Sequence, residues 1–477
     1  MVRRSRSRFD SGPPVTATVT PVVAKVSAYA ALLALACSAA AATLIRARDH
    51  PLAGLISALV ASAALVALAV LDRAGVGPSR AHVFGASAVL LTMAVVVPPR
   101  GSNDVWMYAT YGRMLEHHHV SPYTTTPAQM IVADRRAHRP PDPILARSAR
   151  QWRKVGAVYG PVFVAGAAAW MRVAGTSPLL ARIGFQSLAA LSVAWCLIAL
   201  RRRGPPAALA VLGCHPLVIA FVVNGGHADA LIGALVLASL LAAERRRLLT
   251  AGAVLGLAAS VKATAGLALL GLVIWVWRRH GWRRSAGCAA IGAAVAGLPL
   301  LAAGGRAALR PLLAARGYSS RASVWQFLTL LRGRPVNPGG LAFVCVVVVG
   351  ALLAWDAAGR GVRSQGSGPD GAMALTLAAP LVGFALLAPY VLPWYLFWGL
   401  PLCMVAGRSL LARVLVALMT LELFAYAYVA RAPGLVNAAF RLCERGMGAV
   451  ELGAVVLLIA DGIGIGVFRK RVVGPLG

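Results

Sequence analysis

The chain has 477 residues, of which 59% are hydrophobic and only 13% are charged. A soluble protein of this length could not bury so much apolar surface, so the composition excludes an ordinary soluble fold. The formal net charge of +32 lies largely in Arg clusters between apolar runs, a placement that argues against nucleic acid as a partner and is typical of membrane proteins.

Long apolar runs predict an all-α, polytopic membrane protein. Residues 1–26 are polar and rich in Arg, Ser and Pro, which indicates a disordered cytoplasmic tail. One domain with about 13–14 transmembrane helices is expected over residues 27–468, followed by a cytoplasmic tail at 469–477. The apolar runs lie at 27–45, 52–71, 81–98, 179–200, 206–223, 228–243, 250–261, 264–277, 284–303, 339–356, 372–390, 394–407, 409–430 and 447–468.

The distribution of Arg predicts how this domain is oriented. The cluster in residues 3–8 places the N-terminus inside, so three crossings put the long polar segment 99–155 outside, with interfacial helices. The polar segment 304–338 is expected on the same side. Residues 156–174 also look helical, but a crossing there would put Arg201 outside. We therefore expect that stretch to be an interfacial or re-entrant helix.

Asp104 opens the outer segment and is one of only 15 acidic residues in the chain. An ionisable group where a membrane helix meets water is a functional candidate, because charge near hydrocarbon is costly. If the segment is helical, Tyr108 lies four residues further on the same face, and Arg113 follows. Asp104 is interpreted either as a cap of that helix or as a general base that Tyr108 helps to orient.

Two further polar positions interrupt apolar runs. The turn 224–229 contains two glycines, which permit a tight backbone, and its His227 and Asp229 could bind a sugar or an anion. Asp229 could instead cap the next helix. Lys262 stands alone in a long apolar stretch, where it either snorkels to the lipid headgroups or anchors a phosphate through its ammonium group.

The stretch 389–398 contains two prolines together with Trp394, Tyr395 and other aromatic residues. It is interpreted either as an aromatic belt at the membrane interface or as a broken helix that lines a sugar cavity.

The run His117-His118-His119 is interpreted as a solvated turn. Adjacent His do not share a helical face, and no acid or Cys lies at ligand spacing. No metal and no cofactor are therefore expected. Since no Walker loop is found either, a sugar donor would have to reach the outer face already attached to a lipid.

Taken together, these segments resemble the GT-C superfamily of membrane glycosyltransferases. The chain is most similar to the actinobacterial polyprenol-phosphate-mannose-dependent alpha-(1→6)-mannosyltransferases and their relatives in glycosyltransferase family 87. One departure is Ala228, at a position where family members often carry Asn. The matching stretches are Asn103-Asp104 with Tyr108, Tyr111-Gly112-Arg113, Ser121-Pro122-Tyr123, Tyr159-Gly160-Pro161, Gly226-His227-Ala228-Asp229-Ala230, residues 256–262 and Pro393-Trp394-Tyr395.

The resemblance implies a catalytic base at the start of the first large outer loop, which corresponds to Asp104. It also implies cationic residues that hold the lipid phosphate, for which Lys262 and Arg113 are the best matches. The substrate-binding residues expected on this basis are Tyr108, Arg113, Tyr123, Tyr159, His227, Asp229, Lys262, Trp394 and Tyr395.

The activity implied by the resemblance is a single inverting transfer at the outer face of the plasma membrane. The donor would be a polyprenyl-phosphate-linked hexose, mannose by the family. The acceptor would be a lipid-anchored glycan or a glycolipid, with membrane lipids around the protein. An arabinosyltransferase that uses lipid-linked arabinose fits the motifs equally well. A polytopic lipid or sugar transporter or flippase is a further alternative, which the clustering of polar groups at one face disfavours.

Overall fold

The computed structural model describes residues 21–45, 49–363, 369–426 and 434–463. These residues form helices and no strand, so the predicted all-α class is confirmed. The α-helices are α1 (Pro21–Leu44), α2 (Pro51–Arg73), α3 (Arg80–Val96), α4 (Asp104–Glu116), α5 (Pro127–Arg136), α6 (Pro143–Arg147), α7 (Pro161–Ala174), α8 (Pro178–Leu200), α9 (Pro206–Cys214), α10 (Asp229–Glu244), α11 (Leu248–Val261), α12 (Leu267–His280), α13 (Trp282–Ala302), α14 (Arg306–Ala314), α15 (Val324–Arg332), α16 (Gly339–Arg363), α17 (Pro369–Leu387), α18 (Leu400–Ala406), α19 (Leu410–Ala425) and α20 (Gly434–Ile463).

Short helical turns complete the secondary structure. They are the 3₁₀ helices η1 (Arg150–Trp152), η3 (Ala263–Gly266), η4 (Ala315–Gly317) and η5 (Pro393–Trp398) and the π-helix η2 (Leu217–Val223).

Helix α1 begins at Pro21, so the last residues of the tail predicted over 1–26 are helical. The rest of that tail and the predicted tail 469–477 lie outside the described residues.

Six stretches of the described residues are long and apolar enough to cross a membrane. This is fewer than the 13–14 spans predicted, because several apolar runs are broken into shorter helices. The spans predicted at 250–261 and 264–277 are the helices α11 and α12, of 14 residues each. The run after Pro393 is divided into η5 and α18. The six stretches are Pro21–Leu44, Pro51–Arg73, Pro178–Leu200, Pro206–Val223, Trp282–Ala302 and Gly339–Gly359.

Helix starts follow from local sequence. Proline occupies the first position of α2, α7 and α8, where its fixed φ suits the helix and its missing amide has no cost. Helix α5 starts with a capping box, in which the Thr126 hydroxyl accepts from the Gln129 amide and the Gln129 side chain accepts from the Thr126 amide. Because of these signals, the N-termini of these helices can be predicted from the sequence.

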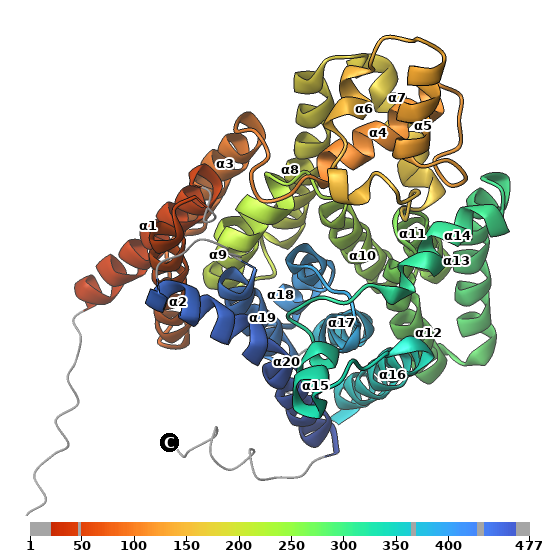
Figure 1. The fold of residues 1–477 in the computed structure, drawn as a ribbon. Helices are drawn as coiled ribbons and strands as arrows, with labels where there is room; N and C mark the ends of the chain where they lie inside the picture. Colours follow the sequence, from red (N-terminus) through yellow and green to blue (C-terminus); the bar gives the residue numbers. More distant parts are fainter. Residues whose placement is uncertain (1–20, 46–48, 364–368, 427–433, 464–477) are drawn as a thin grey trace, which may run out of the picture.

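Helices α4–α7 lie together, at the top of Figure 1, and α4 follows the end of α3 in the chain. Helix α8 starts at this end too, because Arg182 in its first turns donates to the carbonyls of Val95 and Val96 at the end of α3. Helix α7 has only 14 residues, fewer than the roughly 20 that cross a bilayer. Its Ala167 packs against the backbone of Gly112 in α4.

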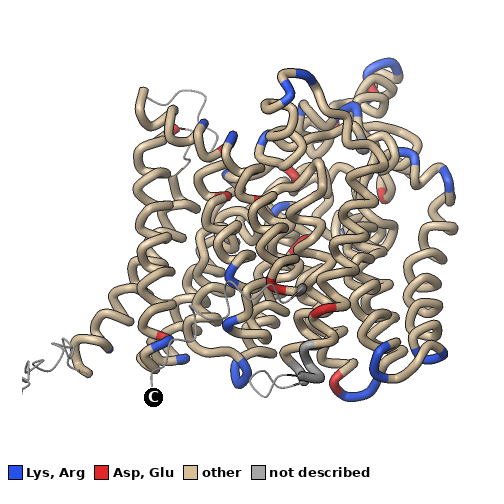
Figure 2. The backbone as a smooth tube through the Cα atoms, turned by 90° about the horizontal axis from the view of Figure 1, so that it is seen from below, with Lys and Arg blue, Asp and Glu red and all other residues tan. Residues whose placement is uncertain are grey.

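The Arg clusters of the short loops gather at the opposite end of the bundle. Arg203, after α8, lies 2.6 Å from Glu244 at the end of α10. His280, at the end of α12, is exposed to the charge of Arg246. The folded segment 99–155 carries further basic residues, so most Lys and Arg lie near the two ends of the bundle (Figure 2).

The two long polar segments predicted on one face lie side by side. The rings of Trp152 and Tyr318 are 5.6 Å apart, and Tyr318 lies 5.8 Å from the ring of Tyr390. The segment around α4–α6, the segment around α14 and the aromatic stretch 389–398 therefore meet at the same end of the bundle.

Candidate active site

Two buried amide side chains fasten the backbone that leads into α4. Asn224 donates from Nδ2 to the Val97 carbonyl at 2.9 Å and accepts at Oδ1 from the Arg100 amide at 3.0 Å. Gln186 donates from Nε2 to the carbonyls of Val97 at 3.0 Å and Asn224 at 2.9 Å. These bonds determine where Asp104, the first residue of α4, is placed.

Asp104 lies next to the imidazole of His227. Asp104 Oδ2 is 3.5 Å from His227 Nε2, which also lies 3.1 Å from the Ser102 hydroxyl. His227 Nδ1 is 2.5 Å from the Phe221 carbonyl, which can only accept, so Nδ1 carries the hydrogen. In the neutral imidazole Nε2 is therefore an acceptor for Ser102, and the Asp104 carboxylate receives no hydrogen bond from it.

Tyr108 lies four residues after Asp104 in α4, and its ring is packed among aromatic side chains. It makes edge contacts with Tyr159, Phe163 and Phe185 at centroid distances of 4.8, 4.9 and 5.6 Å. Burial, together with the charge of Asp104, raises the pKa of this phenol well above its ordinary value. Tyr108 is thus a neutral anchor for α4, and the neighbour that contacts Asp104 is His227 instead.

Neither Asp104 nor Asp229 caps a helix. The N-cap residues of α4 and α10 are Asn103 and Ala228, and neither helix has a side-chain cap hydrogen bond among the described residues. Each acid is instead the first helical residue, where a carboxylate is favoured by the helix dipole. The cap alternatives are therefore not supported, and both carboxylates remain available to other partners.

Lys262 lies where the chain reverses between α11 and α12. Helix α13 runs parallel to α11, since Ser260 donates to the Val295 carbonyl at 3.1 Å. It runs antiparallel to α12, since Ser285 donates to the Val273 carbonyl at 2.9 Å. The lysine is only 8% exposed, so the snorkelling alternative is wrong.

The ammonium group of Lys262 is enclosed by an acid and aromatic faces. Its Nζ lies 3.1 Å from Asp229 Oδ1 and 3.6 Å from the centroid of the Tyr395 ring. Trp398 donates from Nε1 to the same Oδ1 at 2.7 Å. The charge of Asp104 also acts on Lys262. The two acids and the lysine therefore form one electrostatic cluster, to which Trp398 belongs although the sequence did not single it out.

Trp394 supports the histidine of this cluster. Its indole stacks on the His227 imidazole, with ring centroids 3.8 Å apart and an angle of 16° between the planes, and the residue is 2% exposed. The stretch 389–398 thus breaks the helical run with the 3₁₀ helix η5 between α17 and α18, and the sugar cavity of the second interpretation stays a prediction. Its Trp394 and Tyr395 pack on His227 and Lys262.

Tyr123 and Tyr159 join the outer segment to the cluster. The Tyr123 hydroxyl donates to the Tyr159 carbonyl at 2.9 Å, and the Tyr159 ring lies 5.8 Å from Lys262 Nζ. The next residue, Gly160, packs so closely against the Ser260 carbonyl that a Cβ atom would overlap it. Glycine therefore permits the start of α7 to touch the turn that carries Lys262.

Arg113 lies apart from the cluster. It is nine residues beyond Asp104 in α4, or about 13 Å along the helix axis. Its Nε donates to Asp142 Oδ2 at 2.8 Å, and its Nη1 lies 3.5 Å from Glu116. Burial would raise the pKa of Asp142, but hydrogen bonds from Arg113 and two backbone amides outweigh it and lower that pKa. The structure thus pairs Arg113 with carboxylates of the outer segment.

The histidine run is not wholly a solvated turn. His118 Nε2 lies 3.6 Å from Asp142 Oδ2, and ligand atoms of His117, His118 and Asp142 lie within 4.8 Å of one another. The expectation that no acid lies at ligand spacing is wrong, because Asp142 folds back against the run. Its oxygens already accept from Arg113 and the first amides of α6, so the group fits an ion pair better than a cation site.

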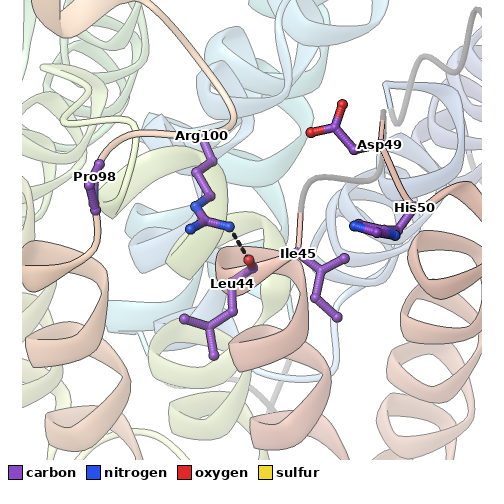
Figure 3. A pocket seen from close by; sticks show the side chains of 6 residues that line it. All are labelled: Leu44, Ile45, Asp49, His50, Pro98 and Arg100. Atoms are coloured by element: carbon purple, nitrogen blue, oxygen red, sulfur yellow. Dashed lines mark hydrogen bonds between the residues drawn. The ribbon is translucent and has the colours of Figure 1, made fainter.

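Two cavities adjoin the segments that carry the cluster. One of about 440 Å³ is lined by Leu44, Ile45, Asp49, His50, Pro98 and Arg100, and in it the Arg100 guanidinium donates to the Leu44 carbonyl (Figure 3). The other, of about 450 Å³, is mostly apolar and lies between Tyr123, the start of α7 and the end of α13. Asp104 and Lys262 line neither cavity.

The chain was compared with protein families, with curated proteins and with solved structures. The family model described as alpha-(1->6)-mannopyranosyltransferase, N-terminal domain, matches residues 16–279, which is more than half of the chain. Alpha-(1->6)-mannopyranosyltransferase A of Corynebacterium glutamicum is 28% identical over 198 residues. That similarity covers 39% of this chain and 38% of the relative, so the chain spans less than two thirds of the relative's length. No solved structure is significantly similar.

The matched range contains Asp104, His227, Asp229 and Lys262, whereas the aromatic stretch 389–398 lies beyond it. The resemblance inferred from the sequence motifs is therefore confirmed at the level of the family. On this evidence the chain belongs to the family of alpha-(1->6)-mannopyranosyltransferases.

Proposed function

We propose that the chain transfers mannose from a polyprenyl-phosphate donor to a glycolipid or glycan acceptor at the outer face of the plasma membrane. Membership of the family supports mannose as the sugar. The observation that carries the proposal is the cluster of Asp104, His227 and Lys262, in which Asp104 Oδ2 lies 3.5 Å from His227 Nε2 and the charge of Asp104 acts on the buried ammonium group.

In the proposed reaction Asp104 takes the proton from an acceptor hydroxyl as that oxygen attacks the anomeric carbon of the donor. The bond from the anomeric carbon to the phosphate oxygen breaks, and the polyprenyl phosphate leaves as an anion. One displacement inverts the anomeric centre, so a single carboxylate is sufficient. Lys262 stabilises the charge that develops on the leaving phosphate.

The contacts within the cluster support a narrower set of roles than the sequence did. His227 accepts from Ser102 and is held by Trp394, so its role is to define the surroundings of Asp104. Arg113 is engaged by Asp142, which supports Lys262 as the phosphate anchor.

The location at the outer face is supported by the Arg clusters. Arg201–Arg203 and the basic residues around His280 lie at the end of the bundle opposite α4, and short loops rich in Arg are cytoplasmic as a rule. The end that carries Asp104 would then face outward, where a lipid-linked donor is available and a nucleotide sugar is not.

The test is a transfer assay with the purified full chain in liposomes that contain polyprenyl-phosphate [³H]mannose. Asp104→Asn keeps the shape of the side chain but removes its basicity, so turnover should fall by roughly 10²–10⁴-fold. The matched control is Asp134→Asn, a buried acid of the outer segment that pairs with Arg139. Its turnover should stay close to that of the wild type.

Three outcomes would contradict the proposal. Normal turnover of a folded Asp104→Asn variant would remove Asp104 from the reaction. Transfer of arabinose but not mannose from matched donors would support the arabinosyltransferase alternative. Movement of the donor lipid across the bilayer without transfer would support a transporter.

A further inference from the structure

The Lys262 ammonium group is not free in this structure, because a carboxylate already neutralises it. Asp229 Oδ1 lies 3.1 Å from Lys262 Nζ, and Trp398 donates to the same oxygen at 2.7 Å. Asp229 is 0% exposed. An anion that reaches Lys262 therefore meets a fixed negative charge directly behind the ammonium group.

The carboxylate is also incompletely satisfied. Both of its polar contacts are made by Oδ1, whereas Oδ2 is buried and has no hydrogen-bond partner among the described residues. A buried acid whose only role is to stabilise the fold is expected to have both oxygens paired. The negative charge of Asp229 is therefore only partly compensated, and it acts electrostatically on Lys262, Tyr395 and Tyr108.

The two lipid phosphates of the proposed reaction differ in charge. The donor is a phosphodiester, which carries one negative charge. The product is a phosphomonoester, which carries about −1.5 to −2 at pH 7. A lysine acting alone would bind the product more tightly than the donor, since attraction grows with charge. The enzyme would then be inhibited by its own leaving group.

We propose that Asp229 is a specificity-determining residue that weakens binding of the phosphomonoester product at the Lys262 site relative to that of the phosphodiester donor. This inference rests on the proposed function, because it takes Lys262 as the phosphate anchor. Asp229 repels the product, which carries more charge, more strongly than the donor, and this limits the advantage that Lys262 gives to the product. Trp398 holds the carboxylate behind the ammonium group, where this repulsion is effective.

The expected size of the effect follows from the geometry. An anion that accepts from Lys262 on the side opposite Asp229 would lie about 6 Å from the carboxylate, since each hydrogen bond spans about 3 Å. At that distance, and at the effective dielectric of a protein site, an extra half to full negative charge changes affinity by roughly ten- to hundredfold. At about 3 Å, the same extra charge is attracted to Lys262 about twice as strongly as Asp229 repels it. Asp229 therefore offsets about half of the preference, in free energy, that Lys262 alone would impose.

The test compares two lipids that differ only in phosphate charge. Farnesyl phosphate is a monoester, and methyl farnesyl phosphate is a diester with the same isoprenoid chain. Their dissociation constants would be measured by isothermal titration calorimetry on the full chain in detergent at neutral pH. The wild type should prefer the monoester by no more than about hundredfold. Asp229→Asn should shift the ratio toward the monoester by roughly ten- to hundredfold.

Two variants control for charge and for folding. Asp229→Glu keeps the charge and should retain the preference of the wild type. Asp72→Asn removes an acid paired with Arg408, outside the cluster, and should leave the ratio unchanged. An unchanged ratio in folded Asp229→Asn would overturn the proposal. If that variant does not fold, the wild type alone decides, because a preference for the monoester above about a thousandfold, close to what Lys262 alone would give, would also overturn the proposal.

These measurements need no catalytic turnover, so the two proposals can fail separately. If the wild type does not transfer mannose but Asp229→Asn shifts the ratio, the proposed function fails while the charge selection at Lys262 stands. If transfer occurs and the ratio does not shift, only the role of Asp229 is lost.

Discussion

The imidazole of His227 lies flat against the indole of Trp394, with 3.8 Å between the ring centroids. Trp394 belongs to η5, which lies beyond the part of the chain that the family model matches. Because His227 also contacts Asp104 at 3.5 Å, the C-terminal part of the chain shapes the surroundings of the proposed base. The cluster is therefore completed only when both parts of the bundle are assembled.

Trp394→Leu should lower turnover through His227. The substitution removes the flat surface that fixes the imidazole, and a shift of about 1 Å in a group near the reacting atoms can cost up to roughly 10²-fold in rate. The dependence on donor concentration should change little, since Lys262 keeps its partners. Trp152→Leu, which removes a ring contact with Tyr318 in the outer loops, is the control. Equal turnover in both variants would count against a role for the stacking.

The Lys262–Asp229 pair predicts different outcomes for single and double substitutions. Lys262→Met leaves a buried carboxylate unpaired, which should cost roughly 3–5 kcal/mol of stability. Combining it with Asp229→Asn should restore much of the melting temperature. Neither the single nor the double variant should have the donor affinity of the wild type, because both lack the charge-assisted contact of Lys262 with the phosphate, worth about 1.5–3 kcal/mol. Normal donor dependence in the double variant would exclude Lys262 as the phosphate anchor.

Arg113 should matter for stability and not for donor binding. Arg113→Met leaves the buried Asp142 without its charged partner, so the melting temperature should fall by an amount equivalent to roughly 3–5 kcal/mol. The folded fraction should show the donor dependence of the wild type in the transfer assay. A raised donor requirement with an unchanged melting temperature would instead restore Arg113 to the phosphate site.

His118 should make the outer segment sensitive to acid. Burial lowers the pKa of His118 below its ordinary value of 6.5, although Asp134 and Asp142 oppose the shift. The unfolded chain then takes up a proton more readily than the folded chain, so stability falls as the pH drops below about 6.5. Between about pH 7.5 and about pH 5.5 the wild type should lose more melting temperature than His118→Gln. His119→Gln, at the exposed neighbour, should behave like the wild type.

The orientation of the bundle can be tested with single cysteines in a chain whose native Cys are replaced by Ala. Ser121→Cys, in the outer segment, should react with a membrane-impermeant maleimide in intact cells. Arg202→Cys, after α8, should react only after permeabilisation. Equal labelling of the two positions in intact cells would contradict the assignment from Arg clusters.

The sequence predicted most of the helices and the end of the bundle at which the polar segments meet. This was possible because apolar runs, prolines at helix starts and Arg clusters are local signals. Asp104, His227, Asp229 and Lys262 were each recognisable as polar residues beside apolar runs. Their mutual distances were not, because they lie on separate helices and turns.

The contacts that the sequence could not show are those between distant segments. Gln186 and Asn224 fasten the backbone before Asp104, yet a buried amide in an apolar helix does not reveal its partner. In the sequence Trp398 cannot be told apart from an aromatic residue at the membrane interface, whereas in the structure its indole donates a hydrogen bond to Asp229. Asp142 was missed as the neighbour of His118 because only local spacing was considered.

The absence of a side chain at Gly160 has a consequence for how sequence variants of this protein should be judged. A methyl group there would overlap the carbonyl of Ser260, which lies two residues before Lys262. The backbone segment that carries the lysine would then have to move. Gly160→Ala lies outside the charged cluster and alters no ionisable group. Its phenotype should nevertheless mimic loss of the proposed phosphate anchor, so the exchange of one small residue for another at this position should not be scored as benign.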